Sequence, residues 1–169
     1  MNNPNRRAWI ASIGFALAGI ISFIIVPSSR ILWPETIFYT VLVINTFFSV
    51  RLFARVAPEN WQQMFVDAAL ALSYLALAFS LGTEWAFPFF ALCIFVAAPI
   101  KYALMLGAVP HSDLLRKKLL IDLSGTTLCI LALLAAVFFD YPVAAAWTLA
   151  IIFSLANIYL LLVKPMYRL

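Results

Sequence analysis

Long apolar segments alternate with short polar breaks along the whole chain. Each apolar segment is about 20 residues long, the length an α-helix needs to cross the hydrocarbon core of a bilayer. Each break contains charges or turn-forming residues such as proline, glycine and serine. The pattern predicts six membrane-spanning helices, at residues 8–26, 36–56, 61–81, 85–106, 119–139 and 143–163.

The composition supports this prediction. Hydrophobic residues make up 66% of the chain and charged residues 11%, whereas soluble domains have about 45–50% apolar and about 25% charged residues. This excludes an ordinary soluble enzyme, a receptor ectodomain and a nucleic-acid-binding module. Six spans leave about 45 of the 169 residues for loops and ends. We therefore expect an all-α protein, a compact bundle of six transmembrane helices that forms a single integral membrane domain over residues 1–169.

The basic residues predict the orientation of the bundle, because cytoplasmic loops of membrane proteins carry an excess of Lys and Arg. With the N-terminus inside, only Arg30 lies on the outer side. The bases on the inner side are Arg6, Arg7, Arg51, Arg55, Lys101, Arg116, Lys117, Lys118, Lys164 and Arg168. Glu35, Glu84 and Asp140 mark the three outer loops. Both termini are thus predicted to be cytoplasmic, in the inner (plasma) membrane of a bacterium.

The five tryptophans provide an independent check, because indole rings prefer the interface between membrane and water. Trp9 and Trp61 fall at inner boundaries of the predicted spans, and Trp33 and Trp85 fall at outer ones. Trp147 lies about one turn inside the outer boundary of the last span. These positions favour the same six spans.

Stripes of small residues predict close helix packing, because helices in lipid approach one another where side chains are small. The stripes are Ala11/Gly14/Ala18/Ser22, Ala69/Ser73/Ala76/Ser80, Gly125/Cys129/Ala132/Ala136 and Ala146/Ala150/Ser154/Asn157. They indicate a tightly packed bundle, and contact between copies of the chain is the alternative.

Four charges intrude into the predicted spans: Arg51, Asp67, Lys101 and Asp122. A charge in mid-bilayer costs about 2.5–3.5 kcal/mol on insertion scales. At 1.5 Å per residue, both bases lie about 22–24 Å from the outer ends of their helices, and Asp67 lies about 9 Å from the inner end of its own. The four residues therefore form one layer in the inner leaflet. Arg51 with Asp67, and Lys101 with Asp122, are the expected hairpin partners.

Two interpretations of this layer remain open. The four residues can be structural ion pairs whose bases reach the interface, or they can line a cytoplasm-facing cavity on an ion or substrate pathway. Asp67 is the strongest pathway candidate, since it is the deepest and no sequence neighbour supplies a counter-charge. Asn45, near mid-membrane, extends the pathway. Pro99, two residues before Lys101, frees the backbone carbonyl of Phe95 and is expected to kink its helix.

Residues of catalytic centres are scarce. The only histidine, His111, is in a loop, and Cys93 and Cys129 stand alone inside apolar runs. This excludes a bis-His haem and the usual zinc ligand sets. We find no phosphate-binding loop, nucleophile motif or paired-carboxylate motif. We therefore expect no catalytic residue, no metal site and no cofactor, and we expect the protein not to be an enzyme.

The loop at 107–118 is the largest predicted cytoplasmic surface. Ser112 or Asp113 can cap the helix that follows. Arg116, Lys117 and Lys118 are expected to meet anionic lipid headgroups, or to bind a membrane or cytoplasmic protein.

These features favour a small integral membrane protein of the transport class, either a solute-binding subunit or a compact permease or channel. Its partners would be the lipid bilayer and a small molecule or ion. The pathway would include Asp67, Arg51, Lys101, Asp122 and Asn45. One alternative is a non-enzymatic assembly or regulatory subunit of a larger membrane complex, and a weaker one is a lipid-modifying membrane enzyme.

Overall fold

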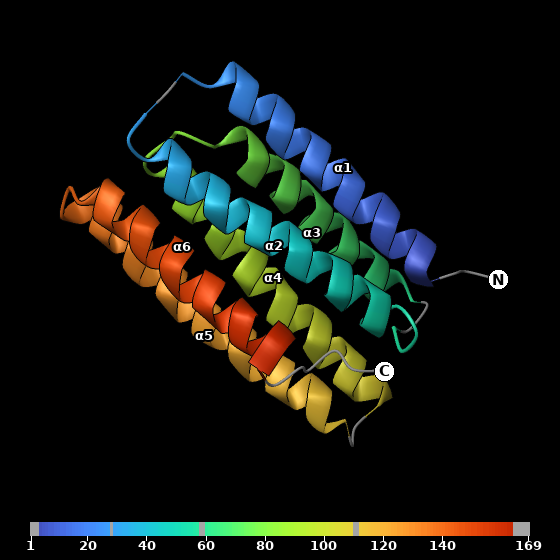
Figure 1. Ribbon diagram of the computed structural model, residues 1–169. Coiled ribbons are helices and arrows are strands. Elements are labelled where there is room, and N and C mark those ends of the chain that lie inside the picture. The colour runs from blue at the N-terminus through green and yellow to red at the C-terminus, as the bar shows by residue number, and fades with distance from the viewer. Residues whose placement is uncertain (1–3, 28, 58–59, 110–111, 164–169) are drawn as a thin grey trace.

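The computed structural model describes residues 4–27, 29–57, 60–109 and 112–163. His111, Lys164 and Arg168 lie outside these ranges. The described chain forms six α-helices and one short π-helical turn. They are α1 (Pro4–Ile25), α2 (Leu32–Phe53), α3 (Trp61–Phe79), α4 (Ala86–Ala108), α5 (Asp113–Phe138), α6 (Pro142–Ile158) and η1 (Tyr159–Val163), shown in Figure 1.

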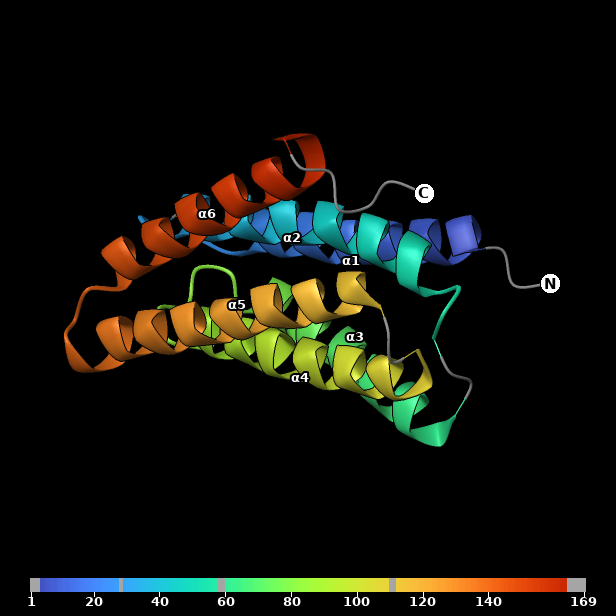
Figure 2. The ribbon, with the colours of Figure 1, turned by 90° about the horizontal axis from the view of Figure 1, so that it is seen from below.

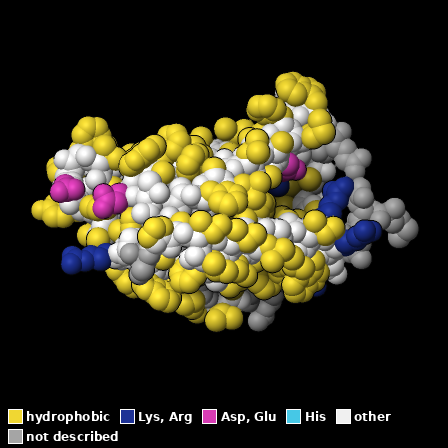
Figure 3. Space-filling view, turned by 90° about the horizontal axis from the view of Figure 1, so that it is seen from above, with side chains coloured by type: hydrophobic (Ala, Val, Ile, Leu, Met, Phe, Trp, Pro, Cys, Tyr) yellow, Lys and Arg dark blue, Asp and Glu magenta, His cyan; other side chains and the backbone are white. Residues whose placement is uncertain are grey.

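Each helix is long and apolar enough to cross a membrane, which indicates an integral membrane protein. The sixth span joins α6 and η1 and has 22 residues. The shortest span, α3, has 19 residues and so a length of about 28 Å, close to the roughly 30 Å of a hydrocarbon core. The outer surface fits this conclusion, because apolar side chains cover most of the face shown in Figure 3. All five tryptophan side chains are exposed on the surface of the bundle, by 41–71%.

Side-chain caps determine where two of the helices begin. The side chain of Asn60 accepts a hydrogen bond from the backbone N–H of Gln63 at 2.8 Å, which starts α3. The hydroxyl of Ser112 accepts one from the N–H of Leu115 at 3.3 Å. This cap starts α5 at Asp113, before the apolar run that predicted a start at 119.

The six helices form a closed ring whose order differs from the order in the sequence. The principal contacts run α1–α2–α6–α5–α4–α3 and back to α1. Figure 2 shows the result as two layers, with α1, α2 and α6 in one and α3, α4 and α5 in the other. The layers meet along two seams, α1–α3 and α5–α6. Because α2 and α3 are in different layers, they are not a packed hairpin although they follow one another in the chain.

The two ends of the bundle differ in charge. We call the end where α1, α3 and α5 begin the basic end, since it carries Arg6, Arg7, Arg55, Arg116 and Lys117. The opposite end, with Glu84 and Asp140, is the acidic end. In Figure 3, basic side chains gather at the basic end and acidic ones at the acidic end. A basic side chain also lies at the acidic end, and an acidic one is recessed near the basic end.

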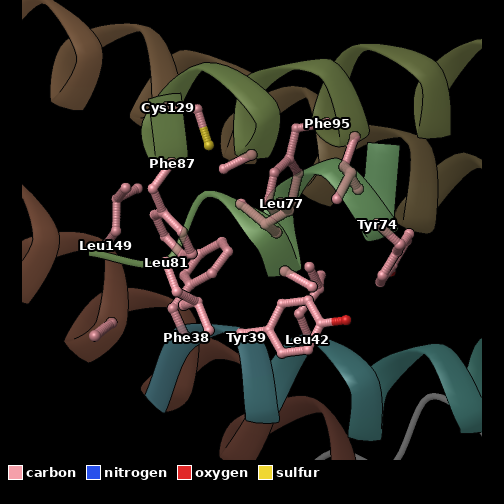
Figure 4. Close-up of a cluster of buried hydrophobic side chains, with 14 of the residues drawn as sticks. Phe38, Tyr39, Leu42, Tyr74, Leu77, Leu81, Phe87, Phe95, Cys129 and Leu149 are labelled. Atoms are coloured by element: carbon pink, nitrogen blue, oxygen red, sulfur yellow. The ribbon is translucent and has the colours of Figure 1, made fainter. Parts of the chain in front are cut away.

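Aromatic and aliphatic side chains close the bundle toward the acidic end (Figure 4). The ring of Phe38 on α2 lies 5.6 Å from that of Phe87 on α4 and 4.8 Å from that of Phe153 on α6, measured between centroids. Leu77 and Leu81 are buried in the same cluster. These contacts join the two layers.

Glu35 is part of this closure and not a loop residue, which corrects the prediction. It lies in the first turn of α2 and is 1% exposed. One carboxyl oxygen, Oε2, accepts a hydrogen bond from the backbone N–H of Gly82 at 2.5 Å. Gly82 adopts a positive φ of 80° that L side chains rarely adopt. This turn aims its N–H at Glu35 and joins α2 to the α3–α4 connection.

One predicted small-residue stripe brings two helices into close contact. A Cβ atom on Gly125 of α5 would lie 2.3 Å from the ring of Phe95 on α4, so only glycine fits there. Cys129 and Ala132 continue this buried face. The stripe on α1 is wrong at Gly14, which is exposed; Gly19 instead packs against Tyr39 of α2.

Gly125 and Gly14 predict different effects of substitution by alanine on stability. Gly125→Ala should overpack the α4–α5 contact and lower the free energy of unfolding by about 1–3 kcal/mol. Gly14→Ala is the matched control, because nothing lies within 4 Å of its added methyl group. Thermal unfolding in detergent measures both variants. Equal melting temperatures for the two would contradict the close contact at Gly125.

The predicted orientation can be tested with cysteines at the two ends. In a Cys93→Ala, Cys129→Ala background, Thr83→Cys at the acidic end should react with a membrane-impermeant maleimide in intact cells. Asp113→Cys at the basic end should react only after permeabilisation, because positively charged ends remain in the cytoplasm. Both parent side chains are exposed. The reverse labelling pattern would show the opposite orientation.

Candidate functional site

A cavity of about 890 Å³ lies between the two layers, toward the basic end. Its volume is within the roughly 300–1,000 Å³ range of ligand pockets. All six α-helices contribute side chains to it. The polar and charged ones are Arg7, Asn45, Thr46, Ser49, Asp67, Tyr74, Lys101, Tyr102, Lys118, Asp122, Ser124, Thr127, Asn157 and Tyr159.

Two ion pairs form the wall contributed by α3, α4 and α5. The ammonium of Lys101 lies 2.7 Å from Oδ1 of Asp67, and the ammonium of Lys118 lies 2.7 Å from Oδ1 of Asp122. Lys118 also lies over the ring of Tyr102, 5.6 Å from its centroid, where a cation is attracted by the negative face of the ring. Each carboxylate in this wall therefore has its own lysine.

The hairpin pairing expected from the sequence is wrong for both carboxylates. Asp67 pairs with Lys101 and not with Arg51, because the ring order packs α3 against α4 and separates it from α2. Asp122 pairs with Lys118, one turn earlier on the same helix, and not with Lys101. Residues four apart on a helix lie on one face, which brings these two side chains together without any other element.

Four of the five predicted pathway residues meet at the cavity. Asp67, Lys101, Asp122 and Asn45 line it, from four different helices. Arg51 is not part of the lining. The cavity thus joins four residues that are up to 77 positions apart, from Asn45 to Asp122, and that come from both layers of the bundle.

Lys118 is a charged lining residue whose position the sequence predicts incorrectly. It was assigned to an exposed basic loop, but it is 6% exposed and its ammonium points to Asp122 inside the bundle. The early start of α5 causes this, since it makes Lys118 a helical residue five positions after Asp113. The spacing of four residues between Lys118 and Asp122 is the feature of the sequence that could have indicated this ion pair. Arg7 was also missed as a lining residue.

The facing wall is uncharged and hydrogen-bonded. The amide of Asn45 on α2 donates to Oδ1 of Asn157 on α6 at 2.5 Å, and the hydroxyl of Ser49 donates to Oδ1 of Asn45 at 3.1 Å. The hydroxyls of Thr46 and Tyr74 hydrogen-bond across the two layers. These bonds satisfy buried polar groups that would otherwise destabilise the bundle.

Aromatic rings form the apolar part of the cavity lining. Phe15 of α1 stacks on Tyr74 of α3 at 4.5 Å between centroids, with an interplanar angle of 16°. Phe95 of α4 and Phe153 of α6 meet edge to face at 5.6 Å. Both pairs cross from one layer to the other, so the cavity has a charged region and an aromatic region.

The cavity reaches the surface at both seams. On the α1–α3 side, Arg7 is exposed and the side chain of Asp67 is 46% exposed. On the α5–α6 side, the lining residues Ser124, Thr127 and Ile152 are exposed. Figure 3 shows an acidic side chain beside a basic one, recessed between apolar surfaces near the basic end. The Asp67–Lys101 pair is thus at a mouth, whereas the Lys118–Asp122 pair is enclosed, with side chains 7% and 3% exposed.

Pro99 frees a backbone carbonyl beside the cavity, as the sequence predicts, and α5 supplies its partner. The hydroxyl of Thr126 donates to the carbonyl of Phe95 at 2.5 Å, and also to that of Asp122 one turn back at 3.0 Å. Because the missing N–H of Pro99 would otherwise leave the Phe95 carbonyl without its helical donor, this hydrogen bond stabilises the α4–α5 contact.

Comparisons of the chain with protein-family models, with curated proteins and with solved structures give no match. Among the residues that the structure describes, no three His, Cys, Asp or Glu side chains gather closely enough to hold a metal ion. The chemistry of the cavity is therefore that of its ion pairs, amides, hydroxyls and aromatic rings.

The bond between Thr126 and Phe95 can be tested by a double-mutant cycle. Thr126→Val should lower the free energy of unfolding by about 1–3 kcal/mol, because it leaves a buried carbonyl without a donor. In a Pro99→Ala background, the restored N–H can supply the donor, so the same change should have a smaller effect. Thermal unfolding of the four proteins measures the coupling. Strictly additive effects would show that Thr126 does not compensate for Pro99.

Proposed function

We propose that this is a small integral membrane protein of the transport class, either a solute-binding subunit or a compact permease or channel, with its solute site in the cavity. The observation that carries the proposal is the convergence of Asp67, Lys101, Asp122 and Asn45 on one cavity of about 890 Å³. Ionisable residues within a membrane commonly mark such pathways. Ion pairs with a solely structural role would need no cavity beside them.

The shape of the bundle supports this proposal. The cluster around Phe38 closes the acidic end, whereas the mouth at Asp67 lies toward the basic end. With the basic end in the cytoplasm, as the charge distribution predicts, the cavity is accessible from the cytoplasm and closed toward the outside. This is the arrangement of a protein that binds a solute from one side of the membrane.

Asp67 is the residue to change first, because a structural role and a role in the site predict different results. The Asp67→Asn variant keeps the size of the side chain and removes its charge. If the site is in the cavity, solute-dependent thermal stabilisation or flux in liposomes should fall at least about tenfold, a difference of about 1.4 kcal/mol. Native mass spectrometry of the purified protein identifies the bound solute to use.

Asp140→Asn is the matched control, because Asp140 is an exposed acid at the acidic end, away from the cavity. It should leave solute binding unchanged. If Asp67→Asn only lowers the free energy of unfolding, by the roughly 0–1 kcal/mol that an exposed ion pair contributes, Asp67 is a structural residue. Loss of a co-purifying protein on changing the exposed Arg116 and Lys117, with no response to solutes, would favour an assembly subunit.

A further inference from the structure

In the buried Lys118–Asp122 ion pair, only one of the two carboxylate oxygens of Asp122 has a hydrogen-bond partner among the described residues. Oδ1 of Asp122 accepts the hydrogen bond from Lys118 at 2.7 Å. Oδ2 is buried and has no hydrogen-bond partner among the residues that the structure describes. Asp122 as a whole is 2% exposed and lines the cavity. A buried carboxylate oxygen that lacks a donor is destabilising, and a molecule in the cavity that Asp122 lines can supply the donor.

From this we infer that the ligand of the cavity is an uncharged or zwitterionic amphipathic molecule. Its polar end donates an O–H or N–H hydrogen bond to Oδ2 of Asp122, and its apolar part packs against the aromatic side chains of the lining. The inference rests on the proposed function and names the class of solute that the site takes.

The hydrogen-bond donor is required by the position of Oδ2. Oδ2 has no donor among the described residues. A ligand group that packs against this oxygen without donating a hydrogen bond leaves a buried acceptor unpaired, which weakens binding. Sites built to hydrogen-bond a substrate hydroxyl or amine reject analogues that lack it, for the same reason.

The two ion pairs of the cavity imply that its ligand carries no net charge. Asp67 is neutralised by Lys101 and Asp122 by Lys118, each at 2.7 Å. Among the residues that the structure describes, the interior lining of the cavity is therefore neutral before a ligand enters. A ligand with a net charge would bring an uncompensated charge into a largely apolar space, which is strongly unfavourable. Arg7, the remaining charged lining residue, is exposed at the mouth.

The apolar part of the ligand follows from the rest of the lining. Rings of Phe15, Tyr74, Phe95 and Phe153 face the cavity from four helices. The α5–α6 seam also offers a route from the bilayer, because the cavity-lining residues Leu131 and Ile152 are exposed there, by 58% and 47%. An amphipathic molecule partitions into the bilayer and can enter by this seam.

A matched set of probes tests the inference on the unmodified protein. The probes are 1-pyrenebutanol, its methyl ether, 1-pyrenebutylamine and 1-pyrenebutyrate, which share one aromatic body and differ only in the polar end. Saturable energy transfer from tryptophan to pyrene in detergent, corrected for empty micelles, measures the dissociation constant. We expect the alcohol to bind at least roughly tenfold more tightly than the ether and more tightly than either ion.

Asp122→Asn should change this preference. The Asn side chain can present its Oδ1 to Lys118 and its NH₂ group to the cavity, so the site then offers a donor in place of an acceptor. The advantage of the alcohol over the ether should be lost or reversed. Asp113→Asn, on the same helix but outside the lining, should keep the original order of affinities.

The possible results separate the inference from the proposed function. If none of the four probes binds, the inference is overturned, and the proposed function is decided separately by the response of solute binding or flux to Asp67→Asn. Binding of the ether as tightly as the alcohol, or tighter binding of an ion, overturns the inference and leaves a binding cavity in place. A folded Asp122→Asn protein that retains the preference for the alcohol overturns the role of Asp122. If that variant does not fold, the order of the four probes on the unmodified protein decides the question.

Discussion

A lysine or aspartate side chain within the thickness of a bilayer is stable only where it meets an opposite charge, a hydrogen-bond partner or water. Most features of this structure follow from that constraint. Lys118 and Asp122 stabilise one another across one helical turn, and Lys101 meets Asp67 across the α3–α4 contact. Both pairs lie on a cavity between the layers and not on the apolar outer surface.

The cavity exists because the two layers pack differently along their length. Toward the acidic end, large side chains such as Phe38 and Phe87 interlock, and Glu35 bonds to the backbone of Gly82. Toward the basic end, the rings of Phe53 and Tyr102 meet at 4.9 Å, and both residues line the cavity. The hydrogen bonds of Asn45 to Asn157 and of Thr46 to Tyr74 keep that polar lining satisfied.

Much of the candidate site could be predicted from the chain itself. Charges are so scarce that Asp67, Lys101 and Asp122 stand out against their apolar surroundings, and their distances from the ends of the helices place them at one depth. Asn45 also stands out, because it is a polar residue near the middle of an apolar segment. The carbonyl freed by Pro99 was also predictable, because it depends only on the proline ring and the geometry of one helix.

The partners of these groups were not predictable, because they depend on which helices are neighbours. Arg51 and Asp67 are close in sequence, yet α2 and α3 are in different layers, so the pairing fails. Thr126 could not be matched to Phe95 before α4 and α5 were seen to pack at Gly125. Glu35 was predicted to lie in a loop because its hydrogen-bond partner, the backbone N–H of Gly82, is 47 residues away in the sequence.

By itself, the sequence predicted six helices long and apolar enough to cross a membrane. It also predicted that Asp67, Lys101 and Asp122 lie within the spans. These depend on local composition and on the fixed rise of an α-helix against the thickness of a bilayer. The tertiary structure decided the ring order, the partner of each charge and the cavity between the layers. These depend on side-chain shapes that meet across helices, such as the glycine at 125 beneath the ring of Phe95, and such contacts leave no periodic signal along a single chain.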